Sequence, residues 1–308
     1  MDNFVNLHVH TEASLQDSVI TIPKLYQQVK QYGQSATAIT DHGSCASFVD
    51  FNNYFKQKGD IKPIFGMEAY CTNQKIFDGN KRRQDHLVLL AMTDEGLVNI
   101  RRLQRLAVDD FYYKPMLHYD TVLEKQHREG IFALSACSSS TISKAILDNN
   151  IQEAYQYAEY FYDLFDGNFA LELQFHPDYQ DQWKINKGIL EISDKLDYPI
   201  VVTCDSHFCN EQDKSLRKII KAIGWHKKID DPTLHSTLKS NCIGNSDLIR
   251  QFARETDFGH DDVVDLAIKN ASYIGKICNA ELEEPARRIP VFDKYDEFIQ
   301  LFDEVDWS

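Results

Sequence analysis

The sequence predicts an α/β fold, a distorted seven-stranded (β/α)7 barrel of the TIM type with a helical C-terminal part. Three observations support this. Short apolar, β-branched-rich runs recur along the chain, helical or turn segments separate them, and no Gly-rich dinucleotide fingerprint or Walker-type loop is present. Strand–helix alternation over this length is typical of a parallel sheet, and seven units favour a closed or nearly closed barrel. An open doubly wound sheet is the alternative architecture.

The elements follow from local composition. Thr21 and Pro23 predict the start of a helix that Gly33 ends. Other helices are expected from Thr93 onward, over Ile151–Phe165 and over Gln182–Leu196, and the chain is mainly helical from about residue 211. The predicted strands are Phe4–Leu7, Ala36–Thr40, Ile61–Phe65, Leu87–Ala91, Ile131–Leu134, Phe169–Leu173 and Ile200–Thr203.

Composition restricts the class of protein. The net charge of −14 argues against a protein that coats duplex DNA, which would need a broad basic surface. We expect no membrane span and no signal peptide, because no run of about 18 apolar residues occurs and the N-terminus lacks a basic region before an apolar core. The seven cysteines are scattered and odd in number, which predicts a reducing compartment, hence the cytoplasm.

Two short segments carry the strongest chemical signal, His8-Val9-His10 and Asp205-Ser206-His207. Each follows an apolar run that is predicted to be a strand. Side chains at positions i and i+2 of a strand point to the same face, so each segment offers two ligands to one point in space. Histidine and aspartate are ligands of divalent metals.

Other residues of ligand type also collect at predicted strand ends. In a barrel, functional groups come from the loops after the strands, so these side chains would meet at one mouth. Each has an ordinary alternative role: Asp41 as a helix cap, Cys137 as a small core residue and Glu68 as a surface acid. Together they are too many for one ion and suit two or three. The set comprises Asp17, Asp41, His42, Glu68, Cys137 and His176.

A cluster of cations of this kind suits phosphate-ester hydrolysis, because cations activate water and neutralise phosphoryl oxygens. Histidine-rich sites with few carboxylates favour Zn²⁺ or Mn²⁺ over Mg²⁺ or Ca²⁺, and a cysteine ligand favours Zn²⁺ at one position. The sequence therefore predicts a metal-dependent phosphoesterase.

Several longer motifs resemble the PHP (polymerase and histidinol phosphatase) family, and most closely the PHP domain of bacterial DNA polymerase III alpha subunits. The resemblance covers roughly residues 1–285. It rests on Asn6-Leu-His-Val-His-Thr, Ala38-Ile-Thr-Asp-His-Gly, Ile61-Lys-Pro-Ile-Phe-Gly-Met-Glu-Ala-Tyr, His86-Leu-Val-Leu-Leu-Ala, Phe111-Tyr-Tyr-Lys-Pro, Leu134-Ser-Ala-Cys and Thr203-Cys-Asp-Ser-His.

The resemblance implies a seven-stranded barrel and a trinuclear metal cluster, about three ions per chain, with zinc or manganese favoured and iron a further candidate. It disagrees with the barrel rule at one residue, because His86 begins its strand, where strand-end geometry would favour His176. Glu68, Asp205 and His207 are the expected catalytic residues, and His176, Arg83 and Lys114 are candidates for phosphate or nucleic-acid contact. The implied metal ligands are His8, His10, Asp17, His42, Glu68, His86, Cys137, Asp205 and His207.

Three functions follow from the resemblance. The first is a metal-dependent nuclease, a 3′→5′ exonuclease on single-stranded DNA ends linked to replication or proofreading. The second is a metal-stabilised interaction module that docks to a separately encoded polymerase subunit. The third is a small-molecule phosphatase of the histidinol-phosphatase type. An intact ligand set favours an enzyme over a scaffold.

The predicted organisation is a phosphoesterase barrel over residues 1–285 and an extension over residues 286–308. Arg288-Ile-Pro-Val-Phe-Asp-Lys-Tyr in that extension resembles the link into a polymerase, so the chain is expected to be a standalone PHP protein or one half of a split polymerase. For Phe111-Tyr112-Tyr113 the sequence favours core packing over stacking on bases.

Overall fold

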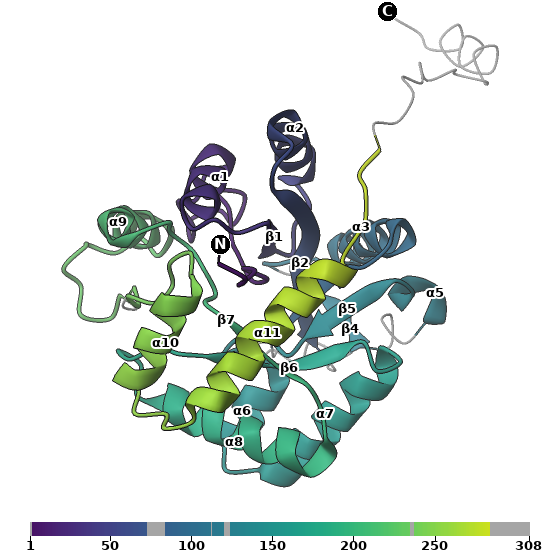
Figure 1. The fold of residues 1–308 in the computed structure, drawn as a ribbon, viewed down its shortest axis with the longest axis vertical. Coiled ribbons are helices and arrows are strands. Elements are labelled where there is room, and N and C mark those ends of the chain that lie inside the picture. The colour runs from purple at the N-terminus through teal and green to yellow at the C-terminus, as the bar shows by residue number, and fades with distance from the viewer. Residues whose placement is uncertain (1, 73–83, 112, 120–123, 235–236, 284–308) are drawn as a thin grey trace, which may run out of the picture.

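A computed structural model describes residues 2–72, 84–111, 113–119, 124–234 and 237–283. Its centre is a seven-stranded mixed sheet surrounded by helices (Figure 1). The strand order is β1-β2-β3-β5-β6-β7, with β4 paired to β2. The strands are β1 (Ala36–His42), β2 (Lys62–Thr72), β3 (Asp85–Ala91), β4 (Leu117–His118), β5 (Ile131–Leu134), β6 (Phe169–Gln174) and β7 (Ile200–Thr203).

The helices are close to those the sequence predicts. Thr21 caps α1, where its side chain accepts a hydrogen bond from the Lys24 amide, and Thr93 caps α3 in the same way. The helices are α1 (Ile22–Gln31), α2 (Phe48–Lys58), α3 (Asp94–Asp109), α5 (Lys125–Arg128), α6 (Thr141–Leu147), α7 (Ile151–Leu164), α8 (Asp181–Leu196), the 3-10 turn η1 (Glu211–Asp213), α9 (Lys214–Gly224), α10 (Ser246–Glu255) and α11 (Asp261–Ile277).

The α/β class and the seven-stranded sheet are confirmed, but the prediction that all strands run parallel is wrong for β3. This strand is antiparallel to both of its neighbours, β2 and β5, whereas β1–β2, β5–β6 and β6–β7 are parallel. The start of β3 therefore lies at the edge where the parallel strands end. His86 faces Tyr70 there, near the end of β2.

The predicted strand Phe4–Leu7 is not a regular strand. Its segment instead makes single parallel bridges to both sides, Asn6 to Thr37 in β1 and Val9 to Ser206 just after β7. The Ala38 amide donates to the Asn6 carbonyl at 2.7 Å, and the Ser206 amide donates to the His8 carbonyl at 3.0 Å. An irregular segment thus joins the two outermost strands, β1 and β7, of the curved sheet.

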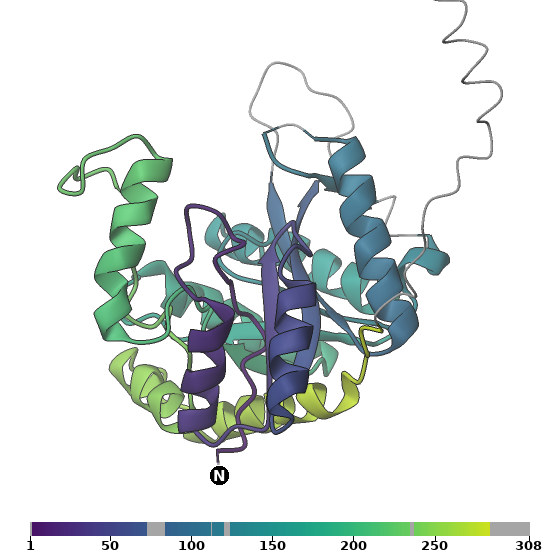
Figure 2. The ribbon, with the colours of Figure 1, turned by 90° about the horizontal axis from the view of Figure 1, so that it is seen from above.

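Apolar side chains fill the interior, and α11 crosses the end of the molecule where the N-terminus lies (Figure 2). Gly275 of α11 lies against Val5, so close that an added Cβ would come within 2.9 Å of the valine methyls. Within the described residues, no helix is long and apolar enough to span a membrane. The predicted boundary at residue 285 stays a prediction, because residues 284–308 lie outside the described part.

Candidate metal centre

Nine side chains of ligand type converge at the edge of the sheet where the parallel strands end. His42, Glu68 and His86 belong to β1, β2 and β3, and the others lie on the N-terminal segment or on loops. We call the set of nine the ligand cluster: His8, His10, Asp17, His42, Glu68, His86, Cys137, Asp205 and His207. Residues separated by almost 200 positions thus meet because the N-terminal segment pairs with the chain after β7.

Glu68 lies at the centre of the ligand cluster and is 1% exposed. Its Oε1 is 3.2 Å from His8 Nε2 and 2.8 Å from His86 Nδ1, and its Oε2 is 2.7 Å from His42 Nδ1. Cys137 Sγ lies 3.7 Å from the same Oε1. One carboxylate therefore faces ligand atoms on both of its oxygens, as a carboxylate that bridges two cations would.

Asp205 and Asp17 form the second part of the cluster. Asp205 Oδ1 lies 3.3 Å from His8 Nε2, 3.2 Å from His10 Nε2 and 3.1 Å from His207 Nε2. Asp17 Oδ2 lies 3.2 Å from His42 Nε2 and 3.5 Å from His207 Nδ1. Asp205 itself has a left-handed backbone with φ 47°, an uncommon conformation that is concentrated at functional sites.

Burial and the charges of neighbouring side chains together determine the protonation of the ligand cluster. Burial opposes ionisation of Glu68, but His86, His8 and His42 outweigh it and hold the pKa of Glu68 well below its usual value. Burial opposes protonation of His42, but Glu68 and Asp17 raise its pKa to about 9. Burial, His42 and His207 instead push the pKa of His10 well below its usual value. The carboxylates are thus anionic and closely opposed to imidazoles.

Several buried atoms of the cluster lack a hydrogen-bond partner among the described residues. These are His42 Nδ1, Glu68 Oε2 and His207 Nδ1. His42 Nδ1 and Glu68 Oε2 approach to 2.7 Å without hydrogen-bond geometry, and His8 Nε2 lies 3.1 Å from His10 Nε2. Buried polar atoms are normally satisfied, so unsatisfied donors and acceptors that face one another fit a bound cation.

Among the described residues, six members of the ligand cluster form three compact groups with ligand atoms within 4.8 Å of one another: His8, His10 and Glu68; His42, Glu68 and His86; and His10, His42 and His207. The groups share residues, as adjoining ion sites do. Imidazoles, carboxylates and one thiol are the ligands that zinc, manganese and iron accept. The donor set therefore fits a divalent metal centre.

Comparison with known proteins identifies the family of the chain. The family model described as PHP domain matches residues 6–176. The chain belongs to the PHP domain family. DNA polymerase III subunit alpha of Aquifex aeolicus is 35% identical over 239 residues, which are 74% of this chain and 20% of that protein. The Treponema pallidum subunit alpha is 30% identical over 303 residues, which are 96% of this chain and 25% of that protein.

This PHP chain therefore spans only about a fifth to a quarter of the length of the curated relatives it matches. A solved structure from Bifidobacterium adolescentis, whose assignment as a metal-dependent phosphoesterase is itself provisional, aligns with a TM-score of 0.37 and 15% identity. The alignment covers 82% of this chain and 96% of that one. The family model and the polymerase relatives confirm the recognition of the PHP family from sequence motifs.

Sequence reasoning missed the residues that hold the ligands of the PHP domain in place. Glu172 of β6 lies 2.7 Å from His8 Nδ1 and orients that ring. Arg217 of α9 donates to Asp17 Oδ1 at 3.0 Å and to the Asp17 carbonyl at 2.9 Å. The signal for Glu172 was a lone acid inside an apolar strand. For Arg217 no sequence signal existed, because it lies 200 residues from Asp17.

Asp41 plays a supporting role. Its Oδ1 accepts from the Thr11 amide at 2.6 Å and from Ser14 Oγ at 2.8 Å, and its Oδ2 accepts from Thr11 Oγ1 at 2.7 Å and Ser47 Oγ at 2.5 Å. Asp41 therefore joins the loop after His10 to the end of β1. The alternative role of Asp41 as a helix cap is wrong, because Asp41 accepts from the side chain of Ser47 and not from a backbone amide of α2.

The three predicted contact residues have different positions. Lys114 lines the cavity at the ligand cluster, and its Nζ lies 4.1 Å from the centre of the Tyr70 ring. His176 is 3% exposed and does not line that cavity, because its nitrogens face Ser240 Oγ at 2.6 Å and Gln174 Oε1 at 3.1 Å. Arg83 lies outside the described residues. Core packing is wrong for Phe111 and Tyr113, which are 61% and 81% exposed.

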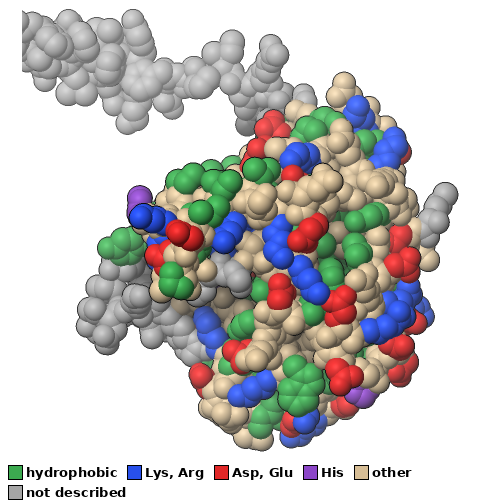
Figure 3. Space-filling model, turned by 90° about the vertical axis from the view of Figure 1, so that its left-hand side faces the viewer, with side chains coloured by type: hydrophobic (Ala, Val, Ile, Leu, Met, Phe, Trp, Pro, Cys, Tyr) green, Lys and Arg blue, Asp and Glu red, His purple; other side chains and the backbone are tan. Residues whose placement is uncertain are grey.

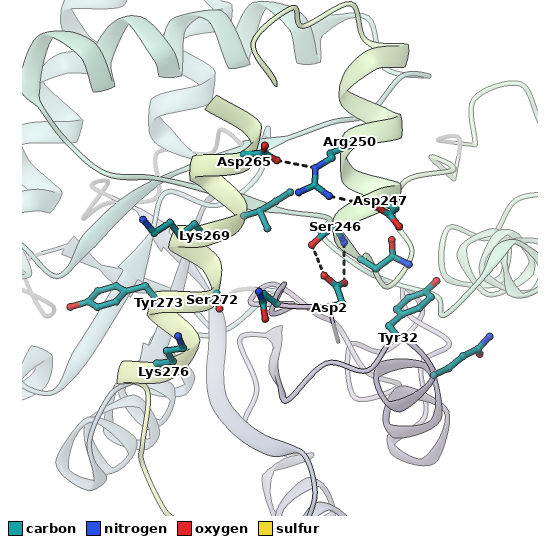
Figure 4. A pocket seen from close by; sticks show the side chains of 14 residues that line it. Asp2, Tyr32, Ser246, Asp247, Arg250, Asp265, Lys269, Ser272, Tyr273 and Lys276 are labelled. Atoms are coloured by element: carbon teal, nitrogen blue, oxygen red, sulfur yellow. Dashed lines mark hydrogen bonds and ion pairs between the residues drawn. The ribbon is translucent and has the colours of Figure 1, made fainter. Parts of the chain in front are cut away.

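The cavity above the ligand cluster, which we call the metal cavity, has a volume of about 600 Å³. A larger cavity of about 910 Å³, the basal groove, lies at the other end of the N-terminal segment, between Asp2, α10 and α11 (Figure 4). The basal groove contains none of the nine ligands.

Proposed function

We propose that this chain is a metal-dependent phosphoesterase that hydrolyses phosphodiester bonds in DNA, as a 3′→5′ exonuclease on single-stranded ends. The observation that carries the proposal is the convergence of nine side chains of ligand type, seven of which line an open cavity. Buried atoms of three of them have no hydrogen-bond partner among the described residues. Its relatives are named as DNA polymerase subunits, which supports DNA as the substrate. A cytoplasmic location is part of this proposal.

We propose that the nine residues of the ligand cluster would hold about three ions per chain, with Glu68 at the centre of the set. Zinc and manganese suit the histidine-rich set, and iron is a third candidate. When bound, such ions lower the pKa of water and neutralise the charge of a phosphate. Glu68, Asp205 and His207 are the proposed catalytic residues. All three line the metal cavity, and the carboxylates of Glu68 and Asp205 each face at least three imidazoles.

The surrounding residues would hold the centre and admit the substrate. Arg217 fixes Asp17 in one rotamer and Glu172 fixes His8, so both ligands are oriented before a cation arrives. Lys114 at the cavity rim offers a positive charge to a phosphate. On the face that carries α9, acidic and basic side chains are interspersed (Figure 3), so binding would depend on the cavity itself more than on a broad basic surface.

The test uses the purified protein with Mn²⁺ or Zn²⁺ and end-labelled single-stranded oligonucleotides, beside a phosphomonoester. Stepwise release of nucleotides from the 3′ end supports the exonuclease. Preference for the monoester would instead favour the small-molecule phosphatase. Failure to hydrolyse either substrate, in a folded and metal-loaded protein, would contradict the proposal.

A second candidate is a metal-stabilised interaction module that docks to a polymerase. The observation that favours it is that the relatives are named as DNA polymerase III subunits. In this reading a separately encoded polymerase subunit is the partner. Co-purification of such a subunit with a chain that binds metal but hydrolyses nothing would support it.

A further inference from the structure

Helix α9 has an inverted distribution of polar and apolar side chains. Arg217 and Lys221 are 5% and 9% exposed, whereas Leu216, Ile219 and Ile223 are 46%, 42% and 62% exposed. In both ribbon views α9 lies at the outer edge of the molecule (Figures 1 and 2). Lysine and arginine are rarely buried unless they are paired, so the inward cationic face needs an explanation.

Arg217 has such an explanation, because all of its guanidinium nitrogens are engaged. Nε and Nη2 donate to Asp17, and Nη1 donates to Asn241 Oδ1 at 2.9 Å. Arg217 is a positioning residue for a ligand of the metal cavity.

Lys221, one turn further along, differs from Arg217. It lines the metal cavity, and among the described residues no hydrogen bond or ion pair of its ammonium group is found. The nearby carboxylates Asp17 and Asp205 are already occupied by Arg217 and by the histidines. Burial and Arg217 keep the pKa of Lys221 below its usual value, despite these two carboxylates. A nearly buried ammonium group in an open cavity is available to an anion.

Trp225 continues the same face at the cavity rim. Its amide donates to the Lys221 carbonyl at 3.0 Å, so the helical spacing of four residues runs from Arg217 through Lys221 to Trp225. Trp225 lines the metal cavity and is 49% exposed. A rise of about 6 Å separates residues four apart on a helix. The face therefore presents a cation in the cavity and an aromatic ring beside it at the rim.

We propose that this face of α9 receives the substrate, with Lys221 binding a phosphate oxygen and Trp225 stacking on the adjoining base. The inference rests on the proposed function and deepens it, because it names the residues that would bind the phosphate and the base of one nucleotide. A positive charge followed by an aromatic platform is the arrangement that single-stranded nucleic acids need, since each nucleotide brings one phosphate and one base.

The test measures binding of inorganic phosphate and of a nuclease-resistant single-stranded phosphorothioate oligonucleotide to the metal-loaded protein by calorimetry. Lys221→Gln should weaken phosphate binding about tenfold, the loss of one charge-assisted hydrogen bond, and Lys221→Arg should restore most of it. The matched control is Lys218→Gln, which removes the same charge from the exposed side of α9 and should leave both affinities unchanged.

Trp225→Leu should leave phosphate binding unchanged and weaken oligonucleotide binding about tenfold, since the base loses the aromatic ring on which it stacks. Lys221→Met replaces the Gln variant if that variant does not fold. Equal phosphate affinity in the wild type and the Lys221 variants overturns the inference. Absence of phosphate binding by the wild-type protein overturns it too, while oligonucleotide hydrolysis by that same protein would leave the proposed function standing.

Discussion

The two ends of the barrel each hold a cavity, and they differ in how their charges are satisfied. The basal groove is larger, yet its central groups are paired. Asp2 accepts from the Ser246 amide and hydroxyl, and Arg250 donates to Asp265 at 2.8 Å (Figure 4). In the metal cavity, His42 Nδ1 and Glu68 Oε2 have no hydrogen-bond partner among the described residues. Because buried polar atoms are normally satisfied, this difference, and not the volume of either cavity, is the reason why we assign the proposed activity to the metal cavity.

The largest expected effect comes from removing a carboxylate at the metal cavity. Asp205→Asn, like His10→Ala, should lower hydrolysis by at least about 100-fold, because each removes a ligand from a cation that activates water. The matched change at the other end, Asp265→Asn in the basal groove, should alter the rate by less than about twofold because its ion pair is exposed. Circular dichroism should remain near wild type for all three. Comparable losses of hydrolysis in Asp205→Asn and Asp265→Asn would contradict the claim that the two cavities differ in function.

The next effect is indirect. Glu172→Gln should weaken metal affinity by roughly 10–100-fold, because the carboxylate that orients His8 is lost. A competition titration with a chromophoric chelator measures this. Glu191→Gln, an exposed carboxylate on α8, serves as the control and should leave the affinity unchanged. An unchanged metal affinity of the Glu172→Gln protein would show that Glu172 does not orient His8 as a metal ligand.

His176 gives a pH-dependent effect beneath the metal cavity. Burial lowers its folded pKa to about 4, against the effect of Asp205 and Asp178 and together with Arg217 and His207. In the unfolded chain its pKa is about 6.5, so between pH 6.5 and 4 only the unfolded state binds this proton. The free energy of unfolding should therefore fall as pH falls, by about 2 kcal/mol at pH 5. Denaturant titrations at several pH values should show a smaller fall in the free energy of unfolding for His176→Gln than for the wild type. The same pH dependence in both proteins would contradict this prediction.

The smallest effect lies in the basal groove. Asp2→Ala should lower the free energy of unfolding by about 1 kcal/mol, because the start of α10 loses an acceptor and a favourable negative charge. Hydrolysis should remain unchanged. A loss of hydrolysis by the folded Asp2→Ala protein would mean that the basal groove takes part in the function.

Sequence patterns predicted the fold class, and the barrel rule or the paired motifs placed eight of the nine members of the ligand cluster at one edge of the sheet. His86 was the exception, and only the family resemblance identified it. Strand direction explains this, because the rule assumed parallel strands and β3 runs the other way. Apolar runs predict where strands lie but carry no information on their direction.

Local sequence patterns also could not predict contacts between residues that lie far apart in the sequence. Glu172, Arg217 and Lys221 are ordinary in sequence, and only the fold places them around residues near position 10. For Phe111 and Tyr113 the sequence made a prediction that is wrong. Their aromatic composition favoured a core position, but the structure exposes both side chains. Burial depends on which face a segment presents, which local composition does not determine.

The central claim is that the ligand cluster is a multinuclear metal centre and the basal groove is not. The most direct measurement is elemental analysis of protein purified without chelators, for the wild type and for the Asp205→Asn and Asp265→Asn variants. The account predicts about three zinc, manganese or iron ions per wild-type and Asp265→Asn chain, and fewer in Asp205→Asn. A folded wild-type protein that hydrolyses the oligonucleotide and contains no metal would contradict it.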